Sequence, residues 1–423
     1  MRHFLSEAKE QFSILTWRVR LVFWSGAILI GAVCAGFAIV SEHANQTFLY
    51  LANHWPWLPF ILTPTALVAI LWATRNWFPG SQGSGIPQAI AALQLEERSS
   101  LLSIRIAIGK ILLTTLGLVC GASIGREGPS VHIGASLMHS LGHFARFPAH
   151  YMERGLILAG GAAGIAAAFN TPMAGIVFAI EEMSKSFEQR TNGIVMTAVI
   201  FAGLTAIVLL GPYHYFGTSQ AEFPQTPSSW MAILLCGIVG GLLGGLFARS
   251  LVSGASLTAP LLQRFPYRFA LGCGLLVALF GWISGFQANG TGYDVAKSII
   301  QNEGEFEPLM PIWKFGATVA SYLSGIPGGI FAPSLAAGAG VGADLANWLP
   351  IAPVATMVLL GMVGYFCGVV QSPITAFVIV MEMTNDNAMM LPLMATSLVA
   401  YAASRFVCPI PIYHSLAQVF LKH

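Results

Sequence analysis

A segment containing glycine and proline occurs twice in this chain, and its two copies lie 204 residues apart. The shared positions are Gly125, Pro129, Ser130, Gly134 and Ala135 in the first copy and Gly329, Pro333, Ser334, Gly338 and Ala339 in the second. Two further segments also match: Asn170-Thr171-Pro172 precedes an apolar run ending at Glu182-Met183, and Gln371-Ser372-Pro373 precedes one ending at Glu382-Met383. This self-similarity predicts one unit of roughly 200 residues present twice. Chance similarity between glycine-rich apolar segments is the alternative.

The chain is too apolar for a soluble domain. Hydrophobic residues make up 55% of its 423 residues and charged residues only 9%, where about a quarter is usual in soluble domains. Glycine (45) and proline (23) interrupt the apolar sequence, and broken backbone at membrane depth is tolerated only where protein or a water-filled cavity satisfies it. We therefore predict an all-α polytopic protein of the lipid bilayer with tilted and broken helices. The runs that approach the roughly 20 residues of a membrane span are 21–40, 58–72, 194–210, 230–247, 269–286 and 354–370.

Charge and cysteine usage exclude other classes. A formal net charge of +2 is too small to indicate a nucleic-acid partner. The six cysteines lie far apart in apolar surroundings, without the spacing of metal ligands. We expect buried, unpaired cysteines, no metal and no cofactor.

Basic residues before the first apolar run predict a cytoplasmic N-terminus: Arg2, Lys9, Arg18 and Arg20. Residues 3–17 have the pattern of an interfacial amphipathic helix, with a solvated leader helix as the alternative, and no cleavable signal peptide is evident. We expect a leader over 1–20, one transmembrane domain over 21–413 with repeats at about 21–211 and 229–413, and a tail over 414–423 without a regulatory domain.

Three glycine-proline turns stand immediately before segments that can form helices: 83–87, 125–129 and 325–329. The first N–H groups of a helix have no intrahelical acceptor and carry roughly half a positive charge, so they attract anions. Transporters built from repeats place such helix starts at the midplane of the membrane. The three turns predict an anion site built without lysine or arginine, whose partial charges release the ion easily.

Ionisable residues in membrane segments are functional hypotheses by default, because their insertion costs about 2.5 to 3.5 kcal/mol. Glu127 stands at one of the predicted helix starts, where it could gate the site and carry a proton; an acid that merely complements the helix dipole is the alternative. Glu182 ends an apolar run and is a candidate for proton entry, or else a carboxylate that reaches water or pairs with Lys185. Glu181 and Glu382 receive no firm role.

One motif points to an enzyme. Gly121-Ala122-Ser123-Ile124-Gly125 fits the GxSxG nucleophile elbow of hydrolases, but that elbow needs a preceding strand and a soluble α/β fold. We expect no enzymatic activity.

The three turns, in this order, resemble the motifs of the CLC chloride channel and transporter family. The segments that carry the resemblance are Gly83-Ser84-Gly85-Ile86-Pro87, Gly125-Arg126-Glu127-Gly128-Pro129, Gly329-Ile330-Phe331-Ala332-Pro333, Phe178 to Met183 and Gln371 to Thr384. The resemblance covers nearly the whole chain. It implies two inverted repeats and a homodimer in which each subunit has its own pore.

The resemblance also implies residue roles. The hydroxyls of Ser84 and Tyr413 and the backbone N–H groups of Ile330 and Phe331 would bind the central chloride, and Glu127 would be the gating glutamate. The outer chloride site would use backbone amides near the helix start that carries Glu127. The full set of expected chloride ligands also includes Gly85, Arg126 and Gly128. The side chain of Arg126 is expected to orient the loop or pair with an acid.

Glu182 matches the internal proton-transfer glutamate of the family's exchangers, so the resemblance implies exchange of two chloride ions for one proton. The expected lack of the regulatory modules of many eukaryotic relatives favours a prokaryotic inner membrane. A voltage- or pH-gated chloride channel is the alternative, as is an exchanger of nitrate or fluoride. Ser84 favours chloride, because nitrate-preferring relatives have proline at this position. Gln88 and Ile90 stand where some relatives carry acids.

Overall fold

The computed structural model describes residues 14–95, 97–144, 151–184, 189–211, 216–217, 219, 221–301 and 306–421. Within these ranges the regular elements are helices, and β pairing is limited to two isolated bridges. The predicted all-α class is therefore confirmed for the described residues. Most of the leader helix expected over residues 3–17 lies outside them, and the first described helix begins at Ile14.

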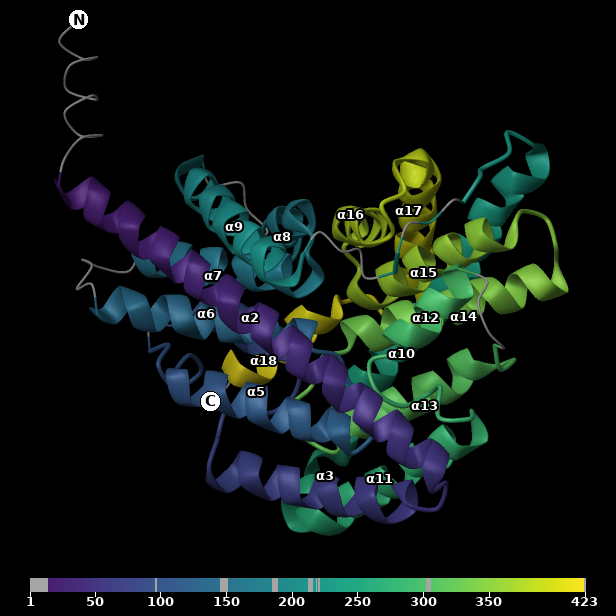
Figure 1. Ribbon diagram of the computed structural model, residues 1–423, viewed down its shortest axis with the longest axis horizontal. Coiled ribbons are helices and arrows are strands. Elements are labelled where there is room, and N and C mark those ends of the chain that lie inside the picture. Colours follow the sequence, from purple (N-terminus) through teal and green to yellow (C-terminus); the bar gives the residue numbers. More distant parts are fainter. Residues whose placement is uncertain are drawn as a thin grey trace, which may run out of the picture.

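Two series of helices follow one another along the chain (Figure 1). The first series is α2 (Ile14–His54), α3 (Pro59–Asn76), α4 (Ile86–Ala92), α5 (Ile104–Val119), α6 (Glu127–Phe144), α7 (Tyr151–Phe169), α8 (Pro172–Phe178), the π-helix η1 (Ala179–Ser184) and α9 (Gln189–Leu210). The second is α10 (Pro227–Arg264), α11 (Pro266–Ile283), α12 (Tyr293–Ile300), α13 (Met310–Leu323), α14 (Phe331–Trp348), α15 (Val354–Val370), α16 (Pro373–Thr384), the 3-10 helix η2 (Asn387–Met389), α17 (Met390–Val407) and α18 (Ile412–Leu421).

The two series repeat the same packing. Helix α6 packs on α7 as α14 packs on α15, and α2 packs on α9 as α10 packs on α17. Pairs across the repeats join the halves, because α3 packs on α11 and α8 packs on α16. Figure 1 shows α6 to α9 on one side, α12 to α17 on the other and α18 between them. This correspondence confirms the internal duplication that the spaced motifs predict.

Proline begins many of these helices. It occupies the first turn of α3, α4, α8, α10, α11, α13 and α16. Its missing N–H costs nothing there, since the first N–H groups of a helix have no intrahelical acceptor. Proline can therefore divide the apolar sequence into short helices without leaving buried backbone donors unpaired.

The six apolar runs fall in α2, α3, α9, α10, α11 and α15, except that Leu58 precedes α3 and residues 284–286 follow α11. Among the described helices, four are long and apolar enough to cross a membrane, and several shorter ones are also apolar. Large apolar side chains remain exposed on the outside of the bundle, for example Val208 at 82% and Leu257 at 76%. Such a surface suits a hydrocarbon solvent, because it would be costly in water.

Helix α10 packs closely through a stripe of glycines. Added Cβ atoms at Gly240 and Gly244 would lie within 3 Å of the backbone of α15, and the neighbouring Gly237, Gly241 and Gly245 face residues of α17. The stripe therefore serves packing within one subunit. The six cysteines are free and buried, as the sequence predicts.

Candidate functional site

The three glycine-proline turns meet at one place inside the protein. The N–H of Gly83 donates to the carbonyl of Ile326 over 3.1 Å, and the N–H of Gly328 donates to the carbonyl of Gly83 over 3.0 Å. Gly125 and Gly329 exchange two backbone hydrogen bonds of 2.7 Å each. Since α4, α6 and α14 begin just after these turns, their N-termini start from a common junction. The structure thus brings together the segments expected to form the anion site.

Two hydroxyl groups at this junction are buried without a hydrogen-bond partner. Ser84 is 1% exposed and Tyr413 is 0% exposed, and the Oγ of Ser84 and the hydroxyl of Tyr413 have no partner among the described residues. An added Cβ on Gly128 would lie 2.2 Å from the Oγ of Ser84, so this hydroxyl lies directly against the start of α6. Helix α18, which carries Tyr413, packs on α4. Because a buried hydroxyl without a partner is costly, the pair is suited to a ligand that accepts hydrogen bonds.

The start of α14 completes the junction. Ile330 is its N-terminal cap and Phe331 its first residue, and both are buried. Gly85 precedes α4 with a φ of 99°, and an added Cβ there would lie 2.5 Å from the Cβ of His132. A side chain at Gly85 would therefore be both strained and blocked.

Glu127 is the first residue of α6 and is fully buried. Its Oε1 accepts a hydrogen bond of 2.5 Å from the hydroxyl of Tyr293, and its Oε2 accepts one of 3.4 Å from the N–H of Ala332 in α14. The carboxylate of one repeat thus reaches the helix start of the other. It takes up an amide donor that an anion could otherwise use.

The side chain of Arg126 lies between α2 and the surroundings of Glu127. Its Nη1 donates to the carbonyl of Ala38 over 2.5 Å, its Nε lies 4.0 Å from Oε1 of Glu127, and its guanidinium lies 5.5 Å from the centre of the Tyr293 ring. These contacts fit the expected orienting role of the side chain.

Glu182 lies in the π-helix η1 and is 2% exposed. Its Oε2 accepts a hydrogen bond from the hydroxyl of Ser372 at the start of α16. The Nε2 of His414 lies 3.2 Å from the carbonyl oxygen of Glu182 and 4.0 Å from its Oε1. The side chain of His414 is 20% exposed, so it connects the buried acid with the surface.

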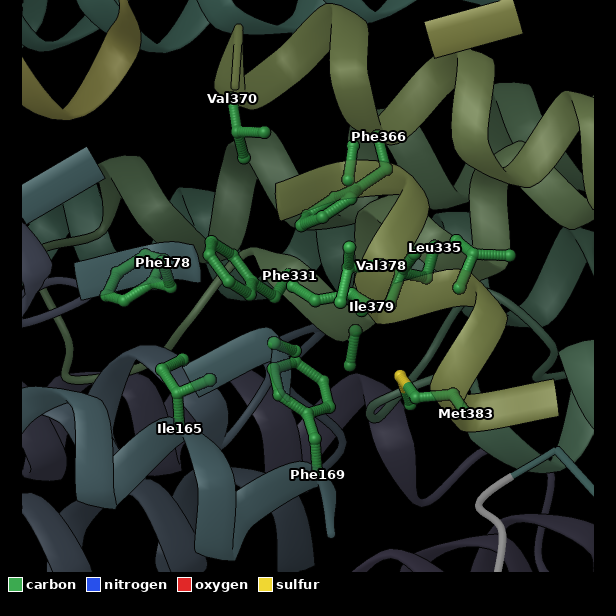
Figure 2. Close-up of a cluster of buried hydrophobic side chains, with 14 of the residues drawn as sticks. Ile165, Phe169, Phe178, Phe331, Leu335, Phe366, Val370, Val378, Ile379 and Met383 are labelled. Atoms are coloured by element: carbon green, nitrogen blue, oxygen red, sulfur yellow. The ribbon is translucent and has the colours of Figure 1, made fainter. Parts of the chain in front are cut away.

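An apolar cluster surrounds the ring of Phe331, the first residue of α14 (Figure 2). The ring of Phe331 lies 4.9 Å from that of Phe366 and 6.0 Å from those of Phe169 and Phe178, centre to centre. It also lies 5.7 Å from the ring of Tyr413.

Two buried lysines were missed by the sequence reasoning. Lys110 donates to the carbonyls of Gln82 and Gly83, directly before Ser84. Lys314 donates to three carbonyls of the turn before α12, those of Ala288, Asn289 and Gly290. The lysines lie 204 residues apart, like the repeated motif, and this spacing is the signal that could have found them. The expectation of an anion site built without lysine or arginine stays a prediction: the Lys110 amine donates to carbonyl oxygens behind the Ser84 turn and so supports the turn.

Tyr293 was also missed. Gly290-Thr291-Gly292-Tyr293 has the pattern of Gly83-Ser84-Gly85-Ile86, and Gly292 precedes α12 with a φ of 82° as Gly85 precedes α4. Tyr293 therefore holds the position of Ile86 in the second repeat. Extending the repeat beyond its two obvious motifs would have found it.

The remaining candidates have structural contacts. The hydroxyl of Ser123 lies 2.9 Å from that of Thr318, and the Ser123 N–H donates to the Oγ of Ser321 over 3.0 Å, so Ser123 is part of a hydroxyl network. Gln88 donates to the carbonyl of Gln82 over 2.6 Å and supports the Ser84 turn. In the described part of the chain, no group of three His, Cys, Asp or Glu residues could hold a metal ion.

A duplicated bundle of broken membrane helices, with helix starts and unpaired hydroxyls at its centre, is the architecture of a membrane transport protein. The model of a family described as voltage gated chloride channel matches residues 65–405. The chain therefore belongs to the CLC family, whose members are transporters and not enzymes.

Curated relatives agree with this membership. The H(+)/Cl(-) exchange transporter ClcA of Cronobacter sakazakii is 31% identical over 445 residues, which cover 100% of this chain and 93% of the relative. The protein of the same name from Vibrio campbellii is 30% identical over 381 residues, which cover 87% of this chain and 81% of the relative.

Solved structures share the fold. A slow cyanobacterial Cl-/H+ antiporter matches with a TM-score of 0.83 and 25% identity, over 96% of this chain and 98% of the antiporter. A CLC-type fluoride/proton antiporter matches with a TM-score of 0.80 and 24% identity, over 94% and 97% of the two chains. The second likeness shows the fold alone.

Proposed function

We propose that this protein is an antiporter that exchanges chloride for protons. The observation that carries the proposal is the pair of unpartnered buried hydroxyls, Ser84 and Tyr413, at a junction of helix starts with a buried acid on either side. The hydroxyls and the N–H groups of Ile330 and Phe331 bind the central chloride, which is the substrate, and no cofactor is needed. The outer chloride site uses backbone amides near Arg126, Glu127 and Gly128, and Gly85 allows α4 to start beside it.

Glu127 is the gate and the outer proton carrier. Its carboxylate already accepts hydrogen bonds from the start of α14 and from Tyr293, so it competes with chloride for positive electrostatic potential. When it takes up a proton, it loses its charge and with it most of its attraction to those donors. Chloride then enters, and the proton moves with the side chain.

Glu182 is the inner proton carrier. It is buried, it accepts a hydrogen bond from Ser372, and the partly exposed His414 lies beside it. The relatives named H(+)/Cl(-) exchange transporters support coupled exchange. We adopt the ratio of two chloride ions per proton that membership of the family implies. We also propose a homodimer with one pore in each subunit, and a location in the cell inner membrane as a multi-pass protein.

Flux through reconstituted vesicles tests the function. Vesicles loaded with chloride and diluted into low chloride should take up protons against a proton gradient while chloride leaves, with both ions recorded by electrodes. Chloride efflux without proton movement would replace the exchanger by a passive channel. Repeating the assay with nitrate and fluoride measures the anion preference, for which Ser84 favours chloride.

A further inference from the structure

Tyr293 and Glu127 form a direct contact between the two repeats. Tyr293 is the first residue of α12 and is 4% exposed. Its hydroxyl donates to Oε1 of Glu127 over 2.5 Å, whereas the amide of Ala332 donates to Oε2 over a longer 3.4 Å. Of these two hydrogen bonds to the Glu127 carboxylate, the one from the Tyr293 hydroxyl is therefore the shorter.

Neighbouring residues fix both the turn before Tyr293 and the ring of Tyr293. Lys314 binds the carbonyls of three successive residues in the turn before it, with distances of 2.8 to 3.1 Å. The guanidinium of Arg126 lies 5.5 Å from the centre of the ring, and the ring of Phe216 lies 5.5 Å from it. A hydroxyl on so constrained a ring pays little entropy when it donates a hydrogen bond.

The equivalent position in the first repeat has no such group. Ile86 begins α4 after Gly85 as Tyr293 begins α12 after Gly292. In the first repeat the turn directs the hydroxyl of Ser84 against α6, and in the second repeat the turn directs Tyr293 to the acid. The duplicated turn has therefore acquired two different tasks.

We propose that Tyr293 is a positioning residue that holds the Glu127 carboxylate in the outer site and so disfavours chloride there. This inference rests on the proposed role of Glu127 as the gate. A hydrogen bond to a charged group stabilises it enough to change an equilibrium by about ten-fold or more. Removal of the hydroxyl alone shifts the competition for the site from carboxylate to chloride.

The test is a calorimetric titration of the detergent-solubilised protein with chloride at constant pH. Tyr293→Phe should tighten chloride binding by about ten-fold, because the carboxylate competes less well. In the Glu127→Ala background the same substitution should cause no tightening, since no carboxylate is left to hold. Unchanged or weaker binding in the wild-type background, or equal tightening in both backgrounds, overturns the proposal.

Tyr365→Phe is the matched control. Tyr365 is also a buried tyrosine, and its hydroxyl has no partner among the described residues, so its removal should leave chloride affinity unchanged. If Tyr293→Phe does not give monodisperse protein, Tyr293→Ile places the first repeat's residue at this position and should give the same tightening. The titration measures chloride binding and not proton transport, so it tests the role of Tyr293 independently of the flux assay. If the wild-type protein moved chloride without protons, the exchange function would be refuted, but the titration would still test whether Tyr293 positions Glu127.

Discussion

Glu181 and Glu382 each bind the start of the other repeat's helix. The Glu181 carboxylate accepts hydrogen bonds from the N–H groups of Ile374 and Thr375 in α16, at 3.2 and 2.6 Å. The Glu382 carboxylate accepts those of Met173 and Ala174 in α8, at 3.1 and 2.7 Å. Each acid thus satisfies two N–H groups that have no intrahelical acceptor.

This reciprocity decides which acids correspond. The matched runs suggest that Glu182 is the twin of Glu382, but the contacts make Glu181 the counterpart. The π-helix η1 follows α8 directly and carries both acids of the first repeat. Glu181 is used for capping, which leaves Glu182 directed to Ser372 and available for another task.

Loss of either cap should destabilise the protein. Glu181→Ala and Glu382→Ala should each lower the free energy of unfolding by about 0.5 to 2 kcal/mol, the usual cost of losing an N-terminal cap. Thermal unfolding in detergent measures this effect, with the exposed Glu97→Ala as a control that should unfold like the wild type. Midpoints unchanged in both cap variants would contradict the capping role.

Glu182→Gln should separate the two fluxes. Glutamine keeps the size and the hydrogen bond to Ser372 but cannot exchange a proton, so proton movement should fall to the background of protein-free vesicles while chloride efflux continues. The measurement is simultaneous recording of both ions. Equal loss of both fluxes would show that Glu182 is structural.

Glu127→Gln should uncouple transport in a different way. The neutral amide imitates the protonated gate, so chloride should pass without waiting for a proton, and proton uptake should cease. Chloride efflux at varied external pH measures this, because the variant should lose the pH dependence that arises from Glu127. Strictly coupled exchange in the variant would reject the gate assignment.

Ser84→Pro should change anion selectivity. The substitution removes a buried hydroxyl that has no protein partner, and loss of a hydrogen bond to a charged ligand weakens binding by about ten-fold. Nitrate should therefore gain on chloride in a competition assay, and Tyr413→Phe should weaken chloride binding by a comparable factor. An unchanged nitrate-to-chloride ratio in Ser84→Pro would remove Ser84 from the selectivity site.

The site could be predicted only as far as the motifs repeat. The turns around Ser84, Glu127 and Phe331 are conspicuous because glycine and proline mark helix starts in an apolar chain. The spacing of the repeat can locate Tyr293 and the two lysines, but no local feature of the sequence shows which groups their side chains contact. Their roles depend on contacts with residues distant in the sequence.

The sequence by itself determined that this chain is a duplicated, helical membrane protein with broken helices, because apolar length, glycine-proline turns and repeat spacing are local or periodic properties. Only the tertiary structure decided that Glu181 caps while Glu182 faces Ser372, that Lys110 lies behind the Ser84 turn and that Tyr293 reaches Glu127. The physical reason is that a side chain's partner in a buried site is set by how the two repeats pack, and a difference of one residue along a helix changes the direction in which a carboxylate points.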